Sequence, residues 1–129
     1  MTIIVNTLSS KNTDKQIEAE KKIATIQLRH EALKELRTEF DKNLEIWQSN
    51  IFEPKYAFDC QKSISNFSLN YSYLFDDETI AWCNDMVFHI NHATLAIRDN
   101  ELSKVEEIFS TTQSTSWNLY SKIGRKIIQ

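Results

Sequence analysis

Apolar residues recur at alternating intervals of three and four positions through the first half of the chain, from Ile23 to Ile51. The positions of this series, called the seam below, are Ile23, Ile26, His30, Leu33, Arg37, Phe40, Leu44, Trp47 and Ile51. Such spacing places side chains along one stripe of an α-helix, in the heptad pattern of helices that pack side by side. The pattern predicts one helix of about forty residues. It begins at Thr13 or Asp14, either of which can cap it, and ends before Pro54.

Three further helical segments follow, at residues 54–73, 77–98 and 101–123 or beyond. The acidic run that starts at Asp76 marks the third helix, since acidic side chains favour helix N-termini. Asp99 or Asn100 is expected to cap the fourth. Short connections imply antiparallel neighbours. The sequence therefore predicts an all-α, up-down bundle of about four helices with a long first helix, over residues 13–129, after a flexible tail at 1–12.

The first helix is predicted to be nearly twice as long as the second or third. Its N-terminal part, residues 14–26, is therefore expected to extend past the bundle beside the C-terminal end of the fourth helix. A two-helix stem of this kind predicts a homodimer or a contact with another protein. The alternative is a first helix that breaks into two pieces and folds back.

Two polar features allow two interpretations each. His30 and Arg37 stand on the seam, where they form either a buried polar layer or the edge of a stripe that drifts to Leu36 and Phe40. The Ser- and Thr-rich segment 110–116 contains few good helix formers. It either bends the fourth helix or is held helical by packing.

Composition narrows the function classes. The chain has one glycine and one proline in 129 residues, so it has no glycine-rich loop for a nucleotide. A net charge of -3 gives no long-range attraction for nucleic acid. No apolar run is long enough to span a membrane, and a cytoplasmic protein is expected. Cys60 and Cys83 lie in helical segments and are expected to be reduced and buried.

One group of residues has the spacing of metal ligands. Asp85, His89 and His92 are separated by four and three positions on the polar arc of the third helix, so their side chains could converge on one ion. Three ligands from one helix rarely complete a closed site, and two histidines with a carboxylate are common on solvated helix faces. The sequence therefore leaves a metal or ligand site here as an alternative function.

The main functional hypothesis rests on aromatic residues. Trp82 and Phe88 flank the apolar face of the third helix, and Trp47 and Trp117 are further candidate anchors for a partner protein. No nucleophile and base stand at a recognisable motif, so neither an enzyme nor a cofactor is predicted. We expect a non-enzymatic protein-binding module, of the inhibitor, immunity or anti-defence type. An acidic mimic of nucleic acid that occupies a basic groove is a second alternative.

Two stretches carry a resemblance. The segment 27–37, Gln-Leu-Arg-His-Glu-Ala-Leu-Lys-Glu-Leu-Arg, precedes Tyr-Leu-Phe-Asp-Asp-Glu-Thr-Ile at 73–80. Together they resemble the helical region of a broad group of uncharacterised bacterial proteins. The resemblance implies a helical fold and a bacterial or phage origin, and it supplies no site residues. Members of that group often carry a membrane-spanning segment before this helix, which this chain lacks.

Overall fold

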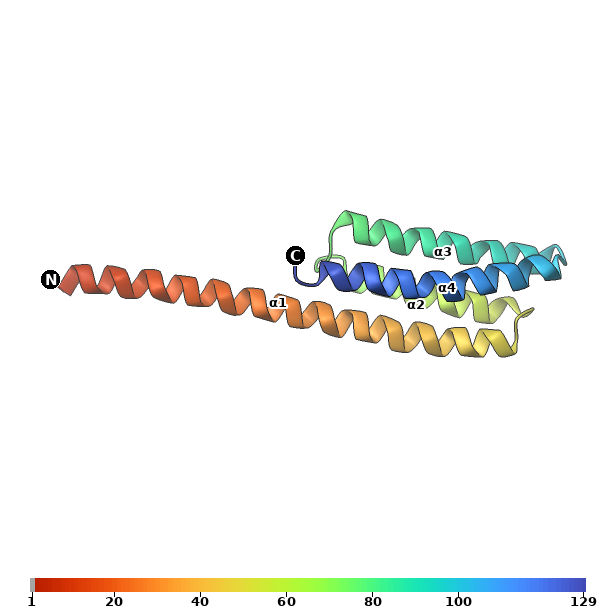
Figure 1. Ribbon diagram of the computed structural model, residues 1–129, viewed down its shortest axis with the longest axis horizontal. Helices are drawn as coiled ribbons and strands as arrows, with labels where there is room; N and C mark the ends of the chain where they lie inside the picture. Colours follow the sequence, from red (N-terminus) through yellow and green to blue (C-terminus); the bar gives the residue numbers. More distant parts are fainter. Residues whose placement is uncertain (1) are drawn as a thin grey trace.

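The structure, a computed structural model, describes the backbone from residue 2 to residue 129 and the side chains from residue 12 onward. It contains α1 (Thr2–Ser49), α2 (Pro54–Tyr71), α3 (Asp77–Arg98) and α4 (Leu102–Lys126). Each helix runs antiparallel to the next, and α1 packs closely on α2 but only loosely on α4 (Figure 1). The predicted all-α bundle with a long first helix is confirmed. None of the described helices is apolar over a length that would cross a bilayer.

Local chemistry explains two of the helix starts. Pro54 occupies the first turn of α2, where its missing N–H costs nothing. Asp76 caps α3: its Oδ1 accepts hydrogen bonds from the backbone N of Thr79 at 2.9 Å and from Thr79 Oγ1 at 2.6 Å. These bonds fix the turn that leads from α2 into α3.

The connection between α3 and α4 differs from the prediction. Asn100 adopts a left-handed backbone with φ of 58°. Its N–H bonds the carbonyl of Ile97, and the N–H of Glu101 bonds that of Ala96 at 2.8 Å, which is the Schellman arrangement. Asn100 therefore ends α3. The prediction that Asp99 or Asn100 caps α4 is wrong, because the cap position is Glu101, whose side chain makes no capping bond.

The core contains residues from all four helices. Its largest fully buried side chains include Trp47, Phe40, Ile64, Ile90, Ile123 and Val105. Trp47 packs edge to face against Phe109, with ring centroids 5.0 Å apart, and its Nε1 donates to the carbonyl of Ile51 at 3.2 Å. Cys60 and Cys83 are free and buried in this core, as predicted.

The seam of α1 passes from the surface into the core. His30 and Arg37 are exposed, whereas Leu36, Phe40 and Trp47 are buried, so the interpretation of a drifting stripe is confirmed. The cause is geometric: a series that repeats every seven residues rotates by about 20° per heptad on a helix with about 3.6 residues per turn.

The Ser- and Thr-rich part of α4 is continuous helix. Thr112 Oγ1 donates to the carbonyl of Ile108 at 2.8 Å, and Thr115 Oγ1 donates to that of Thr111 at 2.7 Å. These hydroxyls bond back to the preceding turn, which satisfies them within the helix. Thr112 and Ser116 are buried, so tertiary packing also holds this segment in place.

The N-terminal half of α1 lies outside the bundle (Figure 1). The helix is unbroken from Thr2, so the predicted start at Thr13 or Asp14 and the folded-back alternative are wrong, and the flexible tail expected at 1–12 stays a prediction. Met1 lies outside the described residues, as do the side chains up to residue 11. No glycine or proline interrupts this stretch, which is why the helix continues. Because α4 ends at Lys126, the predicted two-helix stem is also wrong: beyond the bundle α1 is a single helix (Figure 1).

Candidate functional site

Three of the sequence-predicted residues meet in one groove between α3 and α4. The α3 side consists of Trp82, Asp85, Met86 and His89. The α4 side consists of Thr111, Thr115, Asn118, Leu119 and Lys122. We call this the α3–α4 groove. Its volume is about 250 Å³, enough for one side chain or a small molecule.

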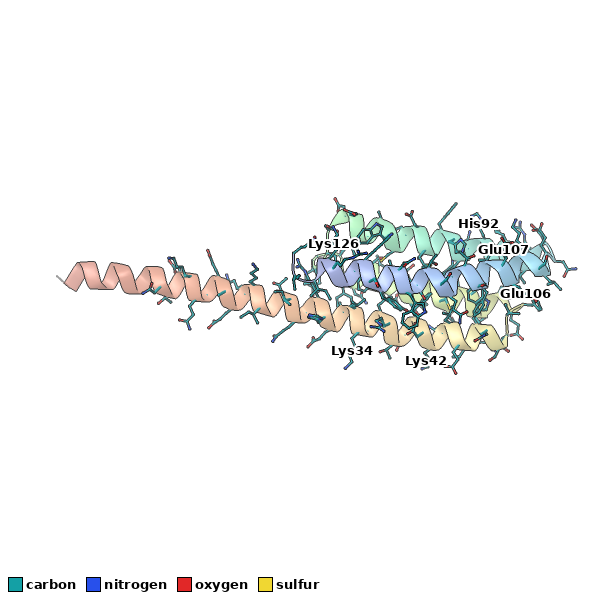
Figure 2. All side chains as sticks on the ribbon, in the orientation of Figure 1. Lys34, Lys42, His92, Glu106, Glu107 and Lys126 are labelled. Atoms are coloured by element: carbon teal, nitrogen blue, oxygen red, sulfur yellow. The ribbon has the colours of Figure 1, made fainter. Side chains whose placement is uncertain are left out.

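Two cations cover Trp82 at one end of this groove. Lys122 Nζ lies 5.2 Å and Lys126 Nζ 5.5 Å from the centroid of the indole ring. Lys126 is neutralised by Asp76 at 2.9 Å and Glu78 at 3.3 Å, at the end of the bundle where the lone part of α1 begins (Figure 2). Lys122 makes no ion pair with any residue that the structure describes. Its charge is therefore available to a ligand.

His89 lies at the other end of the groove. Its Nε2 atom is buried and has no hydrogen-bond partner among the described residues, a costly situation for a polar atom. Asp85 is exposed nearby on the same groove. A bound group that hydrogen-bonds Nε2 would remove this cost.

The predicted metal site is not formed. Within the described part of the chain, no group of three or more His, Cys, Asp or Glu residues is placed to hold a metal ion. His89 turns into the α3–α4 groove, whereas His92 is exposed and lies edge to face with Phe88 at 4.9 Å between ring centroids. Spacing along one helix arc is thus not enough to form a metal site, because the two imidazoles lie in different environments.

The four predicted aromatic anchors have different environments. Trp82 is half-buried under its lysines, Phe88 is 67% exposed and Trp117 is 62% exposed. Trp47 has no exposed surface, so its assignment as a partner anchor is wrong: it belongs to the core. Sequence reasoning missed Lys122 and the α4 side of the groove, since only the packing of α4 on α3 shows that they face Trp82.

A second groove runs along α1 beside α4. It consists of a hollow of about 540 Å³ that is lined by α1 residues alone and one of about 180 Å³ between α1 and α4; the two share Asp41. Its α1 residues are His30, Leu33, Lys34, Arg37, Thr38, Asp41, Leu44, Glu45 and Gln48; its α4 residues are Gln113, Ser116 and Trp117. We call this the α1–α4 groove. It exists because α1 and α4 are the least closely packed neighbours in the bundle.

Tyr120 of α4 contacts two α1 residues that line the α1–α4 groove. Its hydroxyl donates to Asp41 Oδ1 at 2.7 Å, and the guanidinium of Arg37 lies over its ring, 5.2 Å from the centroid. Burial, and then the bond to the Asp41 carboxylate, raises the pKa of Tyr120 above its ordinary value. The hydroxyl therefore stays protonated and keeps α1 and α4 linked at this level.

The third surface is the part of α1 outside the bundle, residues 2–24, which we call the overhang. All of its described side chains, from residue 12 to residue 24, are exposed. They include two large apolar side chains, Ile17 at 42% and Ile23 at 56% exposure. The overhang is about 35 Å long at the usual helical rise.

Comparison with known proteins adds no functional information. No family model matches the chain, and neither the curated proteins nor the solved structures include a significant match. The resemblance to uncharacterised bacterial proteins stays a prediction, and the function is argued from the surfaces described above.

Proposed function

We propose that this chain is a protein-binding module that acts by docking on another protein through the overhang of α1. The observation that carries the proposal is a long single helix that no other part of the described chain covers. Most helices in proteins are stabilised by packing of an apolar face, and isolated helices in water are marginal. The overhang is also rich in Thr, Ser and Asn near its start, which are poor helix formers. A bound partner would supply the missing packing.

The proposal keeps the sequence expectation of a non-enzymatic inhibitor, immunity or anti-defence protein. Proteins of that kind act by occupying a surface of their target, and they need a rigid projecting element more than a reactive site. The bundle would serve as the base that holds the helix, and Ile23 would be an apolar contact that the partner covers.

Site-specific photo-cross-linking tests this proposal. A photoreactive residue at Ala19 should give a discrete protein product in cells that express the chain, and one at Lys42 should not. Lys42 is the matched control because it lies on the bundle, on the outer side of α1 (Figure 2). Ile23→Asp should remove the product from Ala19 without changing the thermal unfolding of the bundle. The absence of any product from Ala19 would overturn the proposal.

A second candidate function, binding of a small ligand in the α3–α4 groove, is favoured by its own observation. The groove combines the unpaired Lys122 cation and the unpartnered His89 Nε2 with an apolar floor at Met86 and Leu119. Benzoate matches this combination of an anion and an apolar ring. Titration should quench Trp82 fluorescence in the native chain and fail in Lys122→Ala, whereas Lys42→Ala should bind normally. An unchanged signal in the native chain would exclude this use of the groove.

A further inference from the structure

We infer that the partner of the overhang is a second copy of this chain, and that each overhang lies antiparallel in the α1–α4 groove of the other copy. The inference rests on the proposed function, because it assumes that the overhang docks on a protein. It adds the identity of that protein and the surface that receives the helix.

The first argument is continuity of one stripe on α1. The seam positions His30, Leu33 and Arg37 line the α1–α4 groove. From there the stripe continues through Ile26 to Ile23 on the overhang, and the same spacing then reaches Ala19, Gln16 and Asn12. The stripe is thus continuous from the overhang to the groove. Side chains spaced in this way line one face of a helix, along which a second helix can pack.

The second argument is symmetry. A two-fold contact uses the same surface on both copies, so the overhang half of one stripe must meet the groove half of the other. With the two-fold axis between Ile23 and Ile26, these two residues from both copies form an apolar centre of four isoleucines. Outward from this centre, Ala19 faces His30 and Gln16 faces Leu33. Small or polar side chains on the overhang therefore oppose the larger groups that line the groove.

The third argument is length. The overhang, residues 2–24, is about 35 Å long, and so is the stretch of α1 that borders the bundle from residue 25 to residue 47. In this register an overhang covers the whole length of the groove without collision between the two bundles. Each copy then contributes about 20–30 residues, the size of a standard interface.

The end of the bundle supplies independent support. Tyr73 and Ile128 are both more than 70% exposed, and both lie where α1 leaves the bundle, beside the carbonyls that Arg29 binds. Large apolar side chains with this exposure, next to two residues that Arg29 binds, are typical of an interaction surface. In the two-fold arrangement the ends of the two bundles abut at this position. The same contact that fills the grooves would therefore cover Tyr73 and Ile128.

Disulfide trapping in the full chain tests the arrangement. A variant with both Ala19→Cys and His30→Cys should form a covalent dimer under mild oxidation. The two positions are about 16 Å apart on one rigid helix, too far for a bond within a chain. The matched control carries Lys21→Cys and Leu28→Cys, which lie at corresponding levels on the opposite face of α1, and should stay uncrosslinked. Native Cys60 and Cys83 do not interfere, because burial raises their thiol pKa to about 12 and about 11.

Light scattering with size-exclusion chromatography supplies the second measurement. The native chain should have twice the mass of one chain at micromolar concentration. Ile23→Asp places two carboxylates in the apolar centre and should weaken the dimer by about 100-fold. Leu28→Asp, on the far face, should leave it unchanged. Circular dichroism checks that both variants keep their bundles folded, since neither side chain belongs to the core.

The outcomes separate the two proposals. A monomeric native chain, or a dimer trapped by the control cysteines and not by Ala19→Cys with His30→Cys, would overturn the second copy as the partner. In that case a cross-linked product from Ala19 with a different protein would still support docking through the overhang. A covalent dimer from the seam cysteines, lost in Ile23→Asp, would establish both.

Discussion

Arg29 donates a hydrogen bond from Nε to the carbonyl oxygen of Leu74 at 2.6 Å, across the end of the bundle. Its Nη1 donates to the carbonyl of Ile127 at 3.0 Å. One side chain of α1 thus ties together the connection that precedes α3 and the residue that follows α4. All described side chains of α1 from residue 24 toward the N-terminus are exposed, so Arg29 lies close to the boundary between bundle and overhang.

Removal of this clamp should loosen the bundle end. Arg29→Ala leaves two carbonyl oxygens without their charged donor, and it should lower the free energy of unfolding by about 2 kcal/mol. Urea denaturation followed by circular dichroism measures the loss. Lys42→Ala, an exposed cation on the same helix, is the control and should change stability by less than about 0.5 kcal/mol. Equal effects of the two substitutions would show that the clamp contributes nothing.

The Asp76 cap should make stability depend on pH. Hydrogen bonds from Thr79 first, and then from Lys126, hold the pKa of Asp76 well below its ordinary value. Because its pKa is lower folded than unfolded, the carboxylate stabilises the fold above the unfolded pKa of about 4 and loses this effect as pH falls. Asp76→Ala should therefore lower the melting temperature at pH 7, and the difference from the native chain should shrink toward pH 2. A difference that is constant from pH 7 to pH 2 would contradict this account.

Replacement of the single glycine by alanine should stabilise the fold. Gly124 lies in the last turns of α4 with an ordinary helical backbone, and a Cβ added there would be 3.9 Å from Leu33 Cδ2, a normal contact. Gly124→Ala should raise the free energy of unfolding by about 0.5 kcal/mol, because alanine loses less backbone entropy in a helix. Thermal unfolding measures the shift. A loss of stability would mean that α1 and α4 need a closer approach at this point.

Substitution of a core tryptophan should cost much more stability than substitution of a surface tryptophan. Trp47→Ala removes a fully buried ring that packs on Phe109, and it should cost about 4 kcal/mol, most of the stability of a small domain. Trp117→Ala removes a ring that is mostly exposed and should cost less than about 1 kcal/mol. Trp47→Phe keeps part of the packing and gives an intermediate value if the first variant fails to fold. Denaturant titrations of the three variants provide the comparison.

Much of the fold could be predicted because its signals are local. Pro54 and Asp76 mark where α2 and α3 begin, and α3 spans Asp77–Arg98 as expected. The start of α1 could not be predicted, because the sequence near Thr13 offers a good cap that the chain does not use. A capping residue makes a helix start favourable, but only a break in the helix makes it necessary.

The candidate sites were less predictable, since they depend on which helices meet. Spacing placed Asp85, His89 and His92 on one arc, and only the packing of α4 shows that Asp85 and His89 line the α3–α4 groove whereas His92 does not. Trp47 and Trp117 are both candidate anchors by their aromatic side chains, although one is in the core and the other on the surface.

By itself the sequence determined that the chain is helical, where its connections lie and that its first helix is the longest, because propensity, capping and periodicity act over a few neighbouring residues. The tertiary structure decided which face of each helix is covered, that α1 passes the end of the bundle as a single helix and that α1 and α4 leave a groove between them. These properties depend on helix lengths and packing compared across the whole chain, which no local pattern contains.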